Sequence, residues 1–172
     1  QDQQEQFMLW AAEHLTQDGV LVYNHKPRRR EGTMIHPGEW FLRPSVRRKL
    51  VLIEEVIWDR GSTHNHGSGL LWPQTERLYV FRRADGKQNF KNTPDLTHRA
   101  DIWRITKTNR NGHACAYPVE LALAVISAWS RPGDLVCDPY LGSGTTAVAA
   151  KMLLGDVNLG GDTQFYVRYA YQ

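Results

Sequence analysis

The residues from Asp138 to Thr146 have the composition of a loop that holds a small ligand. They read Asp-Pro-Tyr-Leu-Gly-Ser-Gly-Thr-Thr, after a short apolar segment and before a helix-like one. Glycines let a backbone turn sharply and approach a ligand that a Cβ atom would exclude. A carboxylate such as Asp138 accepts hydrogen bonds from an ammonium group, and Asp162, which ends the next apolar segment, can bind the two hydroxyls of a ribose. The pattern predicts a site for a cation with an adenosine half, and S-adenosylmethionine is such a molecule.

The same loop permits a second interpretation. The Gly-x-Gly-x-x-Ala sequence that begins at Gly142, with Asp162 near the required offset, satisfies the loose dinucleotide pattern of NAD-dependent oxidoreductases of Rossmann type. Two observations argue against it. Four residues including Pro139 separate the expected strand from the first glycine, and the Asp138 carboxylate would repel a pyrophosphate. A P-loop is excluded because no Gly-Lys-Ser/Thr follows. These two observations favour the first interpretation, and the NAD-dependent oxidoreductase stays open as an alternative.

Alternating helices and strands are expected to position this loop. Apolar spacing predicts helices over 3–16, 37–48, 118–129 and 145–154, and strands over 20–23, 50–58, 77–82, 135–137 and 157–162. Residues 83–112 are polar and turn-rich and show no clear period. The strand–helix–strand order at the end predicts a right-handed crossover in a largely parallel sheet. We expect an α/β, Rossmann-like fold with a terminal antiparallel hairpin strand, in a single domain over 1–172 that is incomplete at both ends.

Length and composition exclude several classes of protein. The 172 residues suffice for one domain with a sizeable core, and 41% hydrophobic with 23% charged residues is an ordinary globular composition. No apolar run approaches the roughly 20 residues of a membrane helix. Two cysteines, Cys115 and Cys137, make no disulfide framework and fit a reducing cytoplasm. Disordered, fibrous, membrane-spanning and disulfide-rich secreted proteins are therefore not expected.

The net charge of +3 is unevenly distributed along the chain. Residues 76–110 carry nine basic and four acidic side chains, whereas 111–172 carry three and five. A basic stretch followed by an acidic one predicts one surface for a polyanion; a solvated loop with scattered cations is the alternative. The run Arg28-Arg29-Arg30 follows the carboxyl end of an expected strand, the edge at which such sheets bind ligands. We favour a DNA contact there over a solvated turn.

Histidines and tryptophans add two smaller predictions. His64 and His66 lie in an expected loop with no second ligand pair at suitable spacing, so no metal site is expected. Most of the six tryptophans are expected in the core, with Trp40 and Trp72 as candidates for exposed positions.

Two segments carry a resemblance to a known family. They are Pro118-Val119-Glu120-Leu121 and the run from Asp134 to Ala147, with support from residues 19–26 and 76–81. Together they resemble the amino-methylating DNA methyltransferases, which modify N6 of adenine or N4 of cytosine. The cofactor segment comes last here, as in the permuted beta class of that family. The resemblance implies an S-adenosylmethionine-dependent methyltransferase fold in a restriction-modification enzyme, with adenine N6 favoured as the target.

The resemblance also implies a role for each residue of the loop. Those that would wrap the methionine group are Asp138, Pro139, Tyr140, Leu141, Gly142 and Gly144. Those that would offer hydroxyls and backbone amides are Ser143, Thr145 and Thr146. Asp162 would hold the ribose, and His113, Pro118 and Glu120 would close over the methionine carboxylate. Residues 113–118 read His-Ala-Cys-Ala-Tyr-Pro, which departs from the His-Pro-x-x-x-Pro of many members.

The family's catalytic motif is Asp, Asn or Ser followed by Pro-Pro and an aromatic residue. No Pro-Pro occurs in this sequence. In the permuted order the motif would precede Gln1, so we expect no catalytic residue within the chain and no methyl transfer by these residues alone. A non-catalytic protein that binds the cofactor or DNA is a further alternative.

The resemblance also implies a DNA partner, no membrane, and a cytoplasmic protein of a bacterium or phage. In this class target recognition lies between the last hairpin strand and the helix at Pro118. The corresponding segment, residues 83–112, is short and predicts a short recognition site in double-stranded DNA. The side chains expected to contact DNA are Arg28, Arg29, Arg30, Arg82, Arg83, Lys87, Lys91, Arg99, Arg104, Lys107 and Arg110.

Overall fold

The computed structural model describes residues 2–61, 71–87, 99–106, 117–131 and 134–154. The chain separates into two compact units, Gln1–Asn89 with Ala100–Arg104, and Phe90–Arg99 with Ile105–Gln172. Across the described ranges, no helix has both the length and the apolar character needed to cross a membrane.

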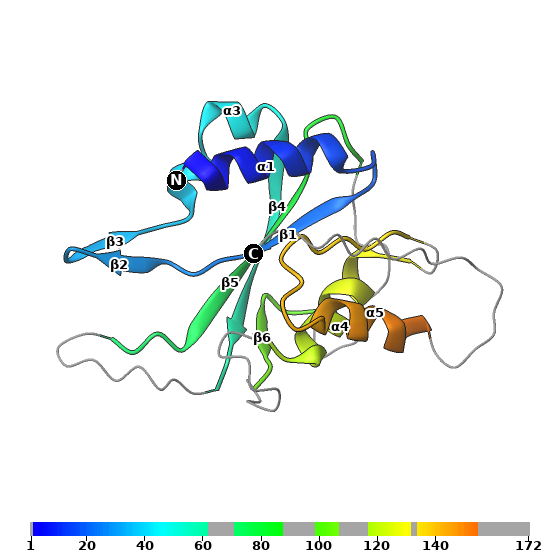
Figure 1. Ribbon diagram of the computed structural model, residues 1–172. Helices are drawn as coiled ribbons and strands as arrows, with labels where there is room; N and C mark the ends of the chain where they lie inside the picture. The colour runs from blue at the N-terminus through cyan, green and yellow to red at the C-terminus, as the bar shows by residue number, and fades with distance from the viewer. Residues whose placement is uncertain (1, 62–70, 88–98, 107–116, 132–133, 155–172) are drawn as a thin grey trace. The chain divides into compact units, whose positions relative to one another are not determined.

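A four-stranded sheet forms the centre of the first unit (Figure 1). Its strands, in spatial order, are β1 (Val20–Asn24), β5 (Thr75–Arg83), β4 (Leu50–Asp59) and β6 (Ile102–Arg104). β5 pairs antiparallel with β1 and with β4, whereas β4 pairs parallel with β6. Three strands therefore run in one direction and β5 runs against them. The carboxyl ends of β1, β4 and β6 share one edge of the sheet, which we call the carboxyl edge; the opposite one is the amino edge.

The sheet corrects the expected fold class in its detail. The α/β class is confirmed, but the described sheet is mixed, and its reversed strand lies between two others instead of at an end. Arg60, which is only 8% exposed, links the antiparallel strands β4 and β5. Its guanidinium donates to the Pro73 and Gln74 carbonyls and to Glu76. These bonds hold the end of β4 beside the start of β5, and two strands joined in this way pair antiparallel.

Strand β6 is a second difference from the sequence prediction. Residues 102–104 lie in the segment for which no regular element is expected, yet they pair with Ile57–Asp59. Trp103, at the middle of this strand, is 2% exposed, and its indole Nε1 donates to the Ala100 carbonyl at 3.0 Å. Three residues are too few to show a period, so burial of one tryptophan and pairing with a longer strand decide the conformation.

Three helices pack with the sheet of the first unit. They are α1 (Asp2–His14), α2 (Gly38–Phe41) and α3 (Pro44–Arg47). The single helix predicted over 37–48 is wrong, because Pro44 has no N–H and holds Arg43 in an extended conformation (φ −60°, ψ 144°). Trp40 is fully buried, against expectation, whereas Trp72 is 57% exposed, as expected. The core cluster comprises Met8, Ala12, Tyr23, Trp40, Phe41, Val46, Leu50, Tyr79 and Phe81.

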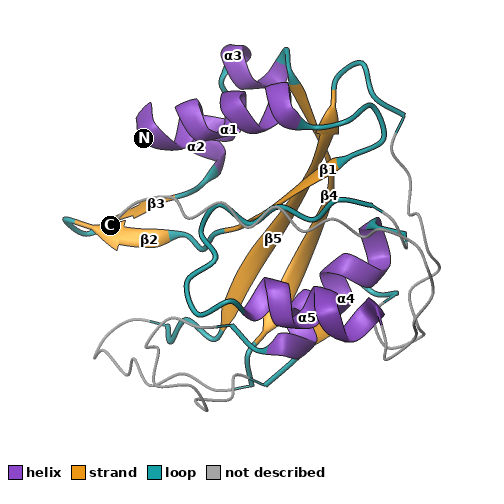
Figure 2. Ribbon diagram, turned by 45° about the vertical axis from the view of Figure 1, so that its right-hand side comes forward, coloured by secondary structure: helices purple, strands orange, loops and turns teal. Residues whose placement is uncertain are grey.

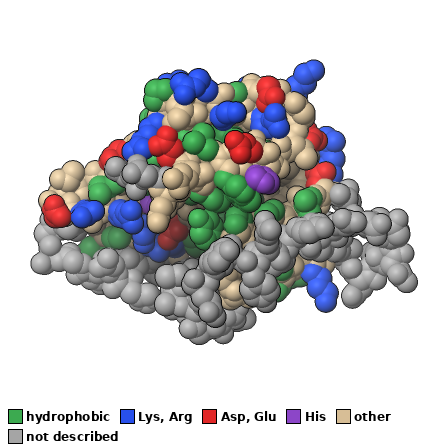
Figure 3. All heavy atoms as spheres, turned by 45° about the horizontal axis from the view of Figure 1, so that its top comes forward, with side chains coloured by type: hydrophobic (Ala, Val, Ile, Leu, Met, Phe, Trp, Pro, Cys, Tyr) green, Lys and Arg blue, Asp and Glu red, His purple; other side chains and the backbone are tan. Residues whose placement is uncertain are grey.

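A two-stranded hairpin follows β1 where the sequence suggests either a DNA contact or a turn. It consists of β2 (Arg28–Arg30) and β3 (Thr33–Ile35), which pair antiparallel. Figure 2 shows it extending away from the four-stranded sheet. All three arginines are exposed. On the face of the molecule shown in Figure 3, basic and acidic side chains are interspersed, in line with the balanced charge of residues 1–60.

The second unit contains α4 (Val119–Trp129) and α5 (Thr145–Leu154), both close to the predicted ranges. Ala122 and Ile126 of α4 pack against Ala149 and Ala150 of α5, and the three small alanine side chains let the two helices approach closely. The core strand predicted over 135–137 is wrong for the described residues. Cys137 forms only an isolated bridge there, and Leu135 is 58% exposed. The strand predicted over 157–162 lies outside the described residues.

Candidate functional site

The glycine-containing loop connects an extended segment that ends at Asp138 to the first residue of α5. Gly142 and Gly144 adopt φ values of 54° and 84°, a region that side chains with a Cβ rarely occupy. The Gly144 amide donates to the Leu141 carbonyl at 2.9 Å, which closes the turn. A Cβ atom built on Gly144 would meet nothing within 4 Å. The backbone conformation therefore requires the glycine, and the space beside it is open to a ligand.

The Asp138 carboxylate is held from three sides. Its Oδ1 accepts from the Tyr140 amide at 2.9 Å. Its Oδ2 accepts from Thr146 Oγ1 at 2.5 Å and from Tyr117 Oη at 3.1 Å. Each donor comes from a different place, namely the turn, the first helical turn of α5 and the residue before the N-cap of α4. The carboxylate is thus oriented by residues at the starts of α4 and α5.

The hydroxyls of Tyr117 and Thr146 also contact each other. Two hydroxyls carry two protons, so they cannot donate in all three contacts within this triangle at once. In one arrangement both donate to Asp138; in another, one hydroxyl donates to the other, which donates to the carboxylate. Burial raises the pKa of Tyr117 to about 12, and the Asp138 charge acts in the same direction. Tyr117 therefore remains a protonated donor at neutral pH.

The three interactions leave Asp138 with unused capacity. A carboxylate has about four lone-pair positions, and one of those on Oδ1 has no partner within the described part of the chain. Neither bond to Oδ2 nor the bond to Oδ1 comes from a cation, so the negative charge is not neutralised by them. The adjacent Cys137 thiol has a raised pKa, through burial and then the Asp138 charge. Cys137 is therefore disfavoured as a thiolate. The Asp138 carboxylate, with a free acceptor position and no cation bound to it among the described residues, can bind a cationic group of a ligand.

The remaining loop residues predicted to bind a cofactor differ in exposure. Thr145 is 6% exposed, and its Oγ1 lies 3.2 Å from Ser143 Oγ. Tyr140 is 70% exposed, and Pro139 and Leu141 are half-buried. Because α5 begins here, its free backbone N–H groups add a site for an anionic group. Residues 138–146 thus form one continuous loop whose backbone amides and hydroxyls are available as donors beside the Asp138 carboxylate.

The other predicted cofactor residues are placed less completely. Pro118 is buried and is the N-cap of α4, with an extended backbone (ψ 150°). Glu120 lies in the first turn of α4 and is exposed. His113 and Asp162 lie outside the described residues. Sequence reasoning did not select Tyr117 as a site residue. The available signal was its position directly before Pro118, because a proline restricts the backbone conformation of the residue before it.

Two of the basic residues predicted to bind DNA lie at the end of the sheet away from Arg104, within the described part of the first unit. Arg82 and Arg83 lie at the amino edge of the sheet, opposite Val20 and Leu50. Arg82 Nη1 donates to the carbonyls of Arg83, Ala84 and Gly86, which closes the turn after β5. Arg83 binds Asp85 through two bonds of 2.8 Å and also donates to the Leu15 carbonyl. Both guanidinium groups thus have structural partners.

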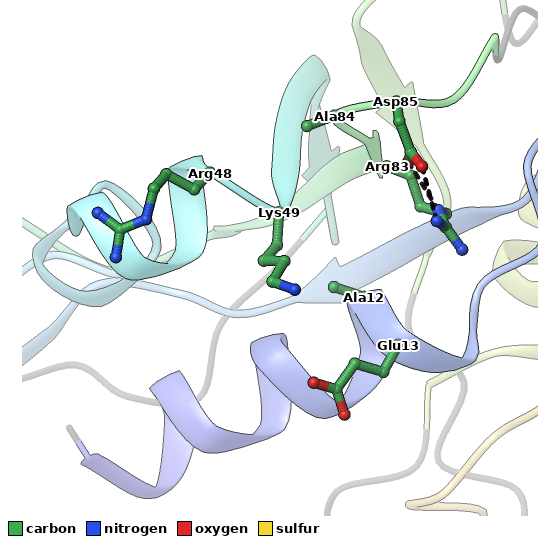
Figure 4. Close-up of a pocket in the computed structure, with 7 residues that line it drawn as sticks. All are labelled: Ala12, Glu13, Arg48, Lys49, Arg83, Ala84 and Asp85. Carbon is green, nitrogen blue, oxygen red and sulfur yellow. Dashed lines mark hydrogen bonds and ion pairs between the residues drawn. The ribbon is translucent and has the colours of Figure 1, made fainter.

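An open hollow at this amino edge has a volume of about 480 Å³. It is lined by Ala12, Glu13, Arg48, Lys49, Arg83, Ala84 and Asp85 (Figure 4). Lys87, exposed, follows in the same region, where its amide donates to the Gln17 carbonyl. Since ligands of open α/β sheets bind outside the carboxyl ends of strands, this hollow is not the candidate site.

The other residues of the first unit that are predicted to contact DNA, within the described ranges, are Arg104 and Arg28–Arg30, and they lie toward the carboxyl edge. Arg104 is the last residue of β6, is exposed, and is paired in register with Asp59. Arg28–Arg30 follow the carboxyl end of β1 on the hairpin. Strand β4, with ten residues, separates this edge from the amino edge by about 30 Å. Arg99 is exposed and belongs to the second unit. Lys91, Lys107 and Arg110 lie outside the described residues.

The sequence and the fold were compared with those of known proteins. A family model described as DNA methylase matches residues 3–157. The type II methyltransferase M.MthZI of Methanothermobacter thermautotrophicus is 32% identical over 126 residues, a match that covers 55% of this chain and 35% of that protein. The chain thus spans little more than a third of the length of such curated relatives.

Solved structures show the same fold. The PvuII DNA methyltransferase, described as cytosine-N4-specific, superposes with a TM-score of 0.74 at 18% identity, over 95% of this chain and 64% of that one. The M1.HpyAVI–SAM complex gives a TM-score of 0.66 at 20% identity, over 87% of this chain and 72% of that one. At these identities the likeness establishes the fold alone.

Proposed function

The chain belongs to the DNA methylase family, and we propose that it forms the S-adenosylmethionine-binding part of an enzyme that methylates an exocyclic amine in double-stranded DNA. The single observation that carries this proposal is the Asp138 carboxylate, which Tyr117, Thr146 and the Tyr140 amide hold at the head of a glycine loop. Family membership also argues against the NAD-dependent oxidoreductase.

The donor set fits S-adenosylmethionine. Asp138 would accept from its α-ammonium group, because an acceptor position on Oδ1 is available and no bond in the loop neutralises the charge. The N-terminal amides of α5, with Ser143 and Thr145, would bind its carboxylate. Open space beside Gly144 leaves room for the ligand. When bound, S-adenosylmethionine supplies an electrophilic methyl group on its sulfonium. Asp162 would hold the ribose, and His113, Pro118 and Glu120 would close over the methionine carboxylate.

The proposed acceptor is a base amine whose lone pair is delocalised into the ring. Because such an amine is a weak nucleophile, orienting and desolvating it is how the protein would accelerate the transfer most. In a duplex this requires turning the base out of the stack. Adenine N6 is the target we propose. The PvuII enzyme is described as specific for cytosine N4, so both products have to be measured.

The test of the cofactor site is calorimetric titration of the protein with S-adenosylmethionine. Asp138→Ala removes a charge-assisted hydrogen bond and is expected to weaken binding by about 10- to 150-fold, from roughly 1.5–3 kcal/mol. The matched control is Asp134→Ala, which removes a carboxylate from the same extended segment. Unchanged affinity in Asp138→Ala would contradict the assignment, and tighter binding of NAD than of S-adenosylmethionine would restore the oxidoreductase.

The test of activity is transfer of labelled methyl to unmethylated duplex DNA by the whole protein. N6-methyladenine and N4-methylcytosine are then quantified separately by mass spectrometry. Methyl in adenine supports the full proposal, whereas methyl in cytosine alone corrects the target base. Binding of cofactor and DNA without transfer would instead support the non-catalytic alternative.

A further inference from the structure

The β2–β3 hairpin is a ribbon with a tight end. Arg30 pairs with Thr33, so only Glu31 and Gly32 form the turn. Their φ values of 52° and 78° are both positive, which is typical of a type I′ turn. Such a turn matches the twist of the two strands, and the ribbon keeps its two-stranded form to its tip. Figures 1 and 2 both show the hairpin extending from the body of the first unit.

The register gives the ribbon two different faces. Arg29 pairs with Met34, and side chains of paired residues lie on the same face. The opposite face carries Arg28 with Ile35 and Arg30 with Thr33. Ile35 packs against the core cluster of the first unit and anchors the base of the hairpin. The face of Arg29 and Met34 is therefore turned away from that anchor, and Met34 is 48% exposed although it is apolar.

The ribbon is strongly cationic. Arg30 contacts Glu31 at 3.5 Å, but both side chains are more than three-quarters exposed, and such a pair contributes little. For Arg28 and Arg29, the described residues supply no carboxylate partner. The positive charges of three consecutive arginines repel one another, and a bound polyanion relieves that repulsion. The hairpin also begins beyond the carboxyl end of β1, at the edge where Arg104 lies.

We propose that this hairpin is a sequence-reading ribbon that enters the major groove of duplex DNA. The inference rests on the proposed function, which supplies DNA as the substrate. The major groove, about 12 Å wide, admits a two-stranded ribbon. Arg29 faces the base edges and binds O6 and N7 of a guanine, while Met34 contacts an apolar base edge such as a thymine methyl. Arg28 and Arg30, on the other face, reach the phosphates of the groove walls.

The experiment selects bound sequences from a pool of duplexes with a randomised centre. Arg29→Gln is expected to lose the preference for guanine at one position, by about 5- to 150-fold in relative enrichment. Arg29→Lys keeps the charge but lacks the planar fork, so it is expected to lose the same preference while retaining the salt dependence. Arg28→Gln and Arg30→Gln are expected to enrich the same sequence as the unaltered protein. Each should lower the slope of log affinity against log salt by about 1.

Arg47→Gln is the matched control, since Arg47 is exposed on α3 and the same charge is removed. It is expected to change neither the enriched sequence nor the slope, and circular dichroism checks that each variant is folded. If Arg29→Gln enriches the same DNA sequence as the unaltered protein, the ribbon proposal alone is overturned, even if the affinity of the variant falls equally for all duplexes. A protein that binds no duplex in the pool, although it binds S-adenosylmethionine, overturns the DNA part of the proposed function and this proposal with it.

Discussion

Tyr117 and Asp138 lie 21 positions apart in the chain, and the phenol of the first donates to Oδ2 of the second at 3.1 Å. This bond links the start of α4 to the glycine loop before α5. It makes Tyr117 a positioning residue for the proposed cofactor site, because it orients the carboxylate that would bind the ligand.

Tyr117→Phe is expected to weaken S-adenosylmethionine binding moderately. Thr146 still holds Asp138, and the lost bond acts on the ligand only through the carboxylate, so we expect a loss of about 2- to 12-fold in affinity, from roughly 0.5–1.5 kcal/mol. Calorimetry measures the change. The matched control is Tyr79→Phe, a buried tyrosine of the first unit whose pKa is likewise raised to about 12. A Tyr117→Phe protein with full affinity would show that the phenol does not orient Asp138.

Gly144→Ala is expected to lower stability and cofactor affinity together. At φ 84° an alanine is strained by about 1–2 kcal/mol, and relief of that strain would move the loop. Gly32→Ala is the control, since Gly32 has φ 78° and is equally open, but lies in the hairpin turn. Both variants should lower the unfolding midpoint in urea. Only Gly144→Ala should weaken S-adenosylmethionine binding; an equal loss in both would contradict a local role for the loop.

Glu76→Gln is expected to destabilise the sheet more than Glu55→Gln. Glu76 binds Arg60 at 3.1 Å with side chains 19% and 10% exposed, whereas Glu55 binds Arg77 at 3.2 Å with side chains 46% and 29% exposed. Leaving the Arg60 charge short of a partner costs about 1–3 kcal/mol, and the exposed pair is worth less than about 1 kcal/mol. Urea denaturation of both variants measures the difference. Equal free energies of unfolding would show that burial of the pair does not matter.

The Arg83–Asp85 pair is expected to make stability fall in acid. Hydrogen bonds from Arg83 lower the pKa of Asp85 from 3.8 to about 2. The folded state therefore binds the proton less tightly than the unfolded chain, so the pair stabilises the protein above about pH 4. That contribution is lost as the pH falls through about 2. Asp85→Asn should lower the melting temperature at pH 7, with a difference from the unaltered protein that shrinks between pH 4 and 2. The control is Glu54→Gln, which removes a carboxylate at an exposed position of β4.

The two edges of the sheet should differ in their effect on DNA binding. Arg104→Gln, at the carboxyl edge, is expected to lower the slope of log affinity against log salt by about 1. Arg82→Gln, at the amino edge, is expected to leave the slope unchanged and to lower stability, because its guanidinium closes the turn after β5. Salt titrations with a labelled duplex measure both. A slope that changes only in Arg82→Gln would place the DNA surface at the amino edge.

The sequence by itself determined the longer helices and strands and the position of the glycine loop. Helices α4 and α5, strands β4 and β5, and the glycine loop follow from local patterns, because apolar periodicity and the glycine conformation act over neighbouring residues. The aspartate before that loop is likewise identified from its immediate neighbours. The family resemblance carried by the loop agrees with the match to the DNA methylase model over residues 3–157.

Tertiary structure alone decided which distant residues meet. Only the packing of α4 on α5 brings Tyr117 to Asp138, and only the sheet register separates Arg82 and Arg83 from Arg104 by the length of β4. The same holds for β6, whose three residues take their conformation from pairing with β4. Local sequence cannot specify such relationships, because they depend on register and on contacts between elements far apart in the chain.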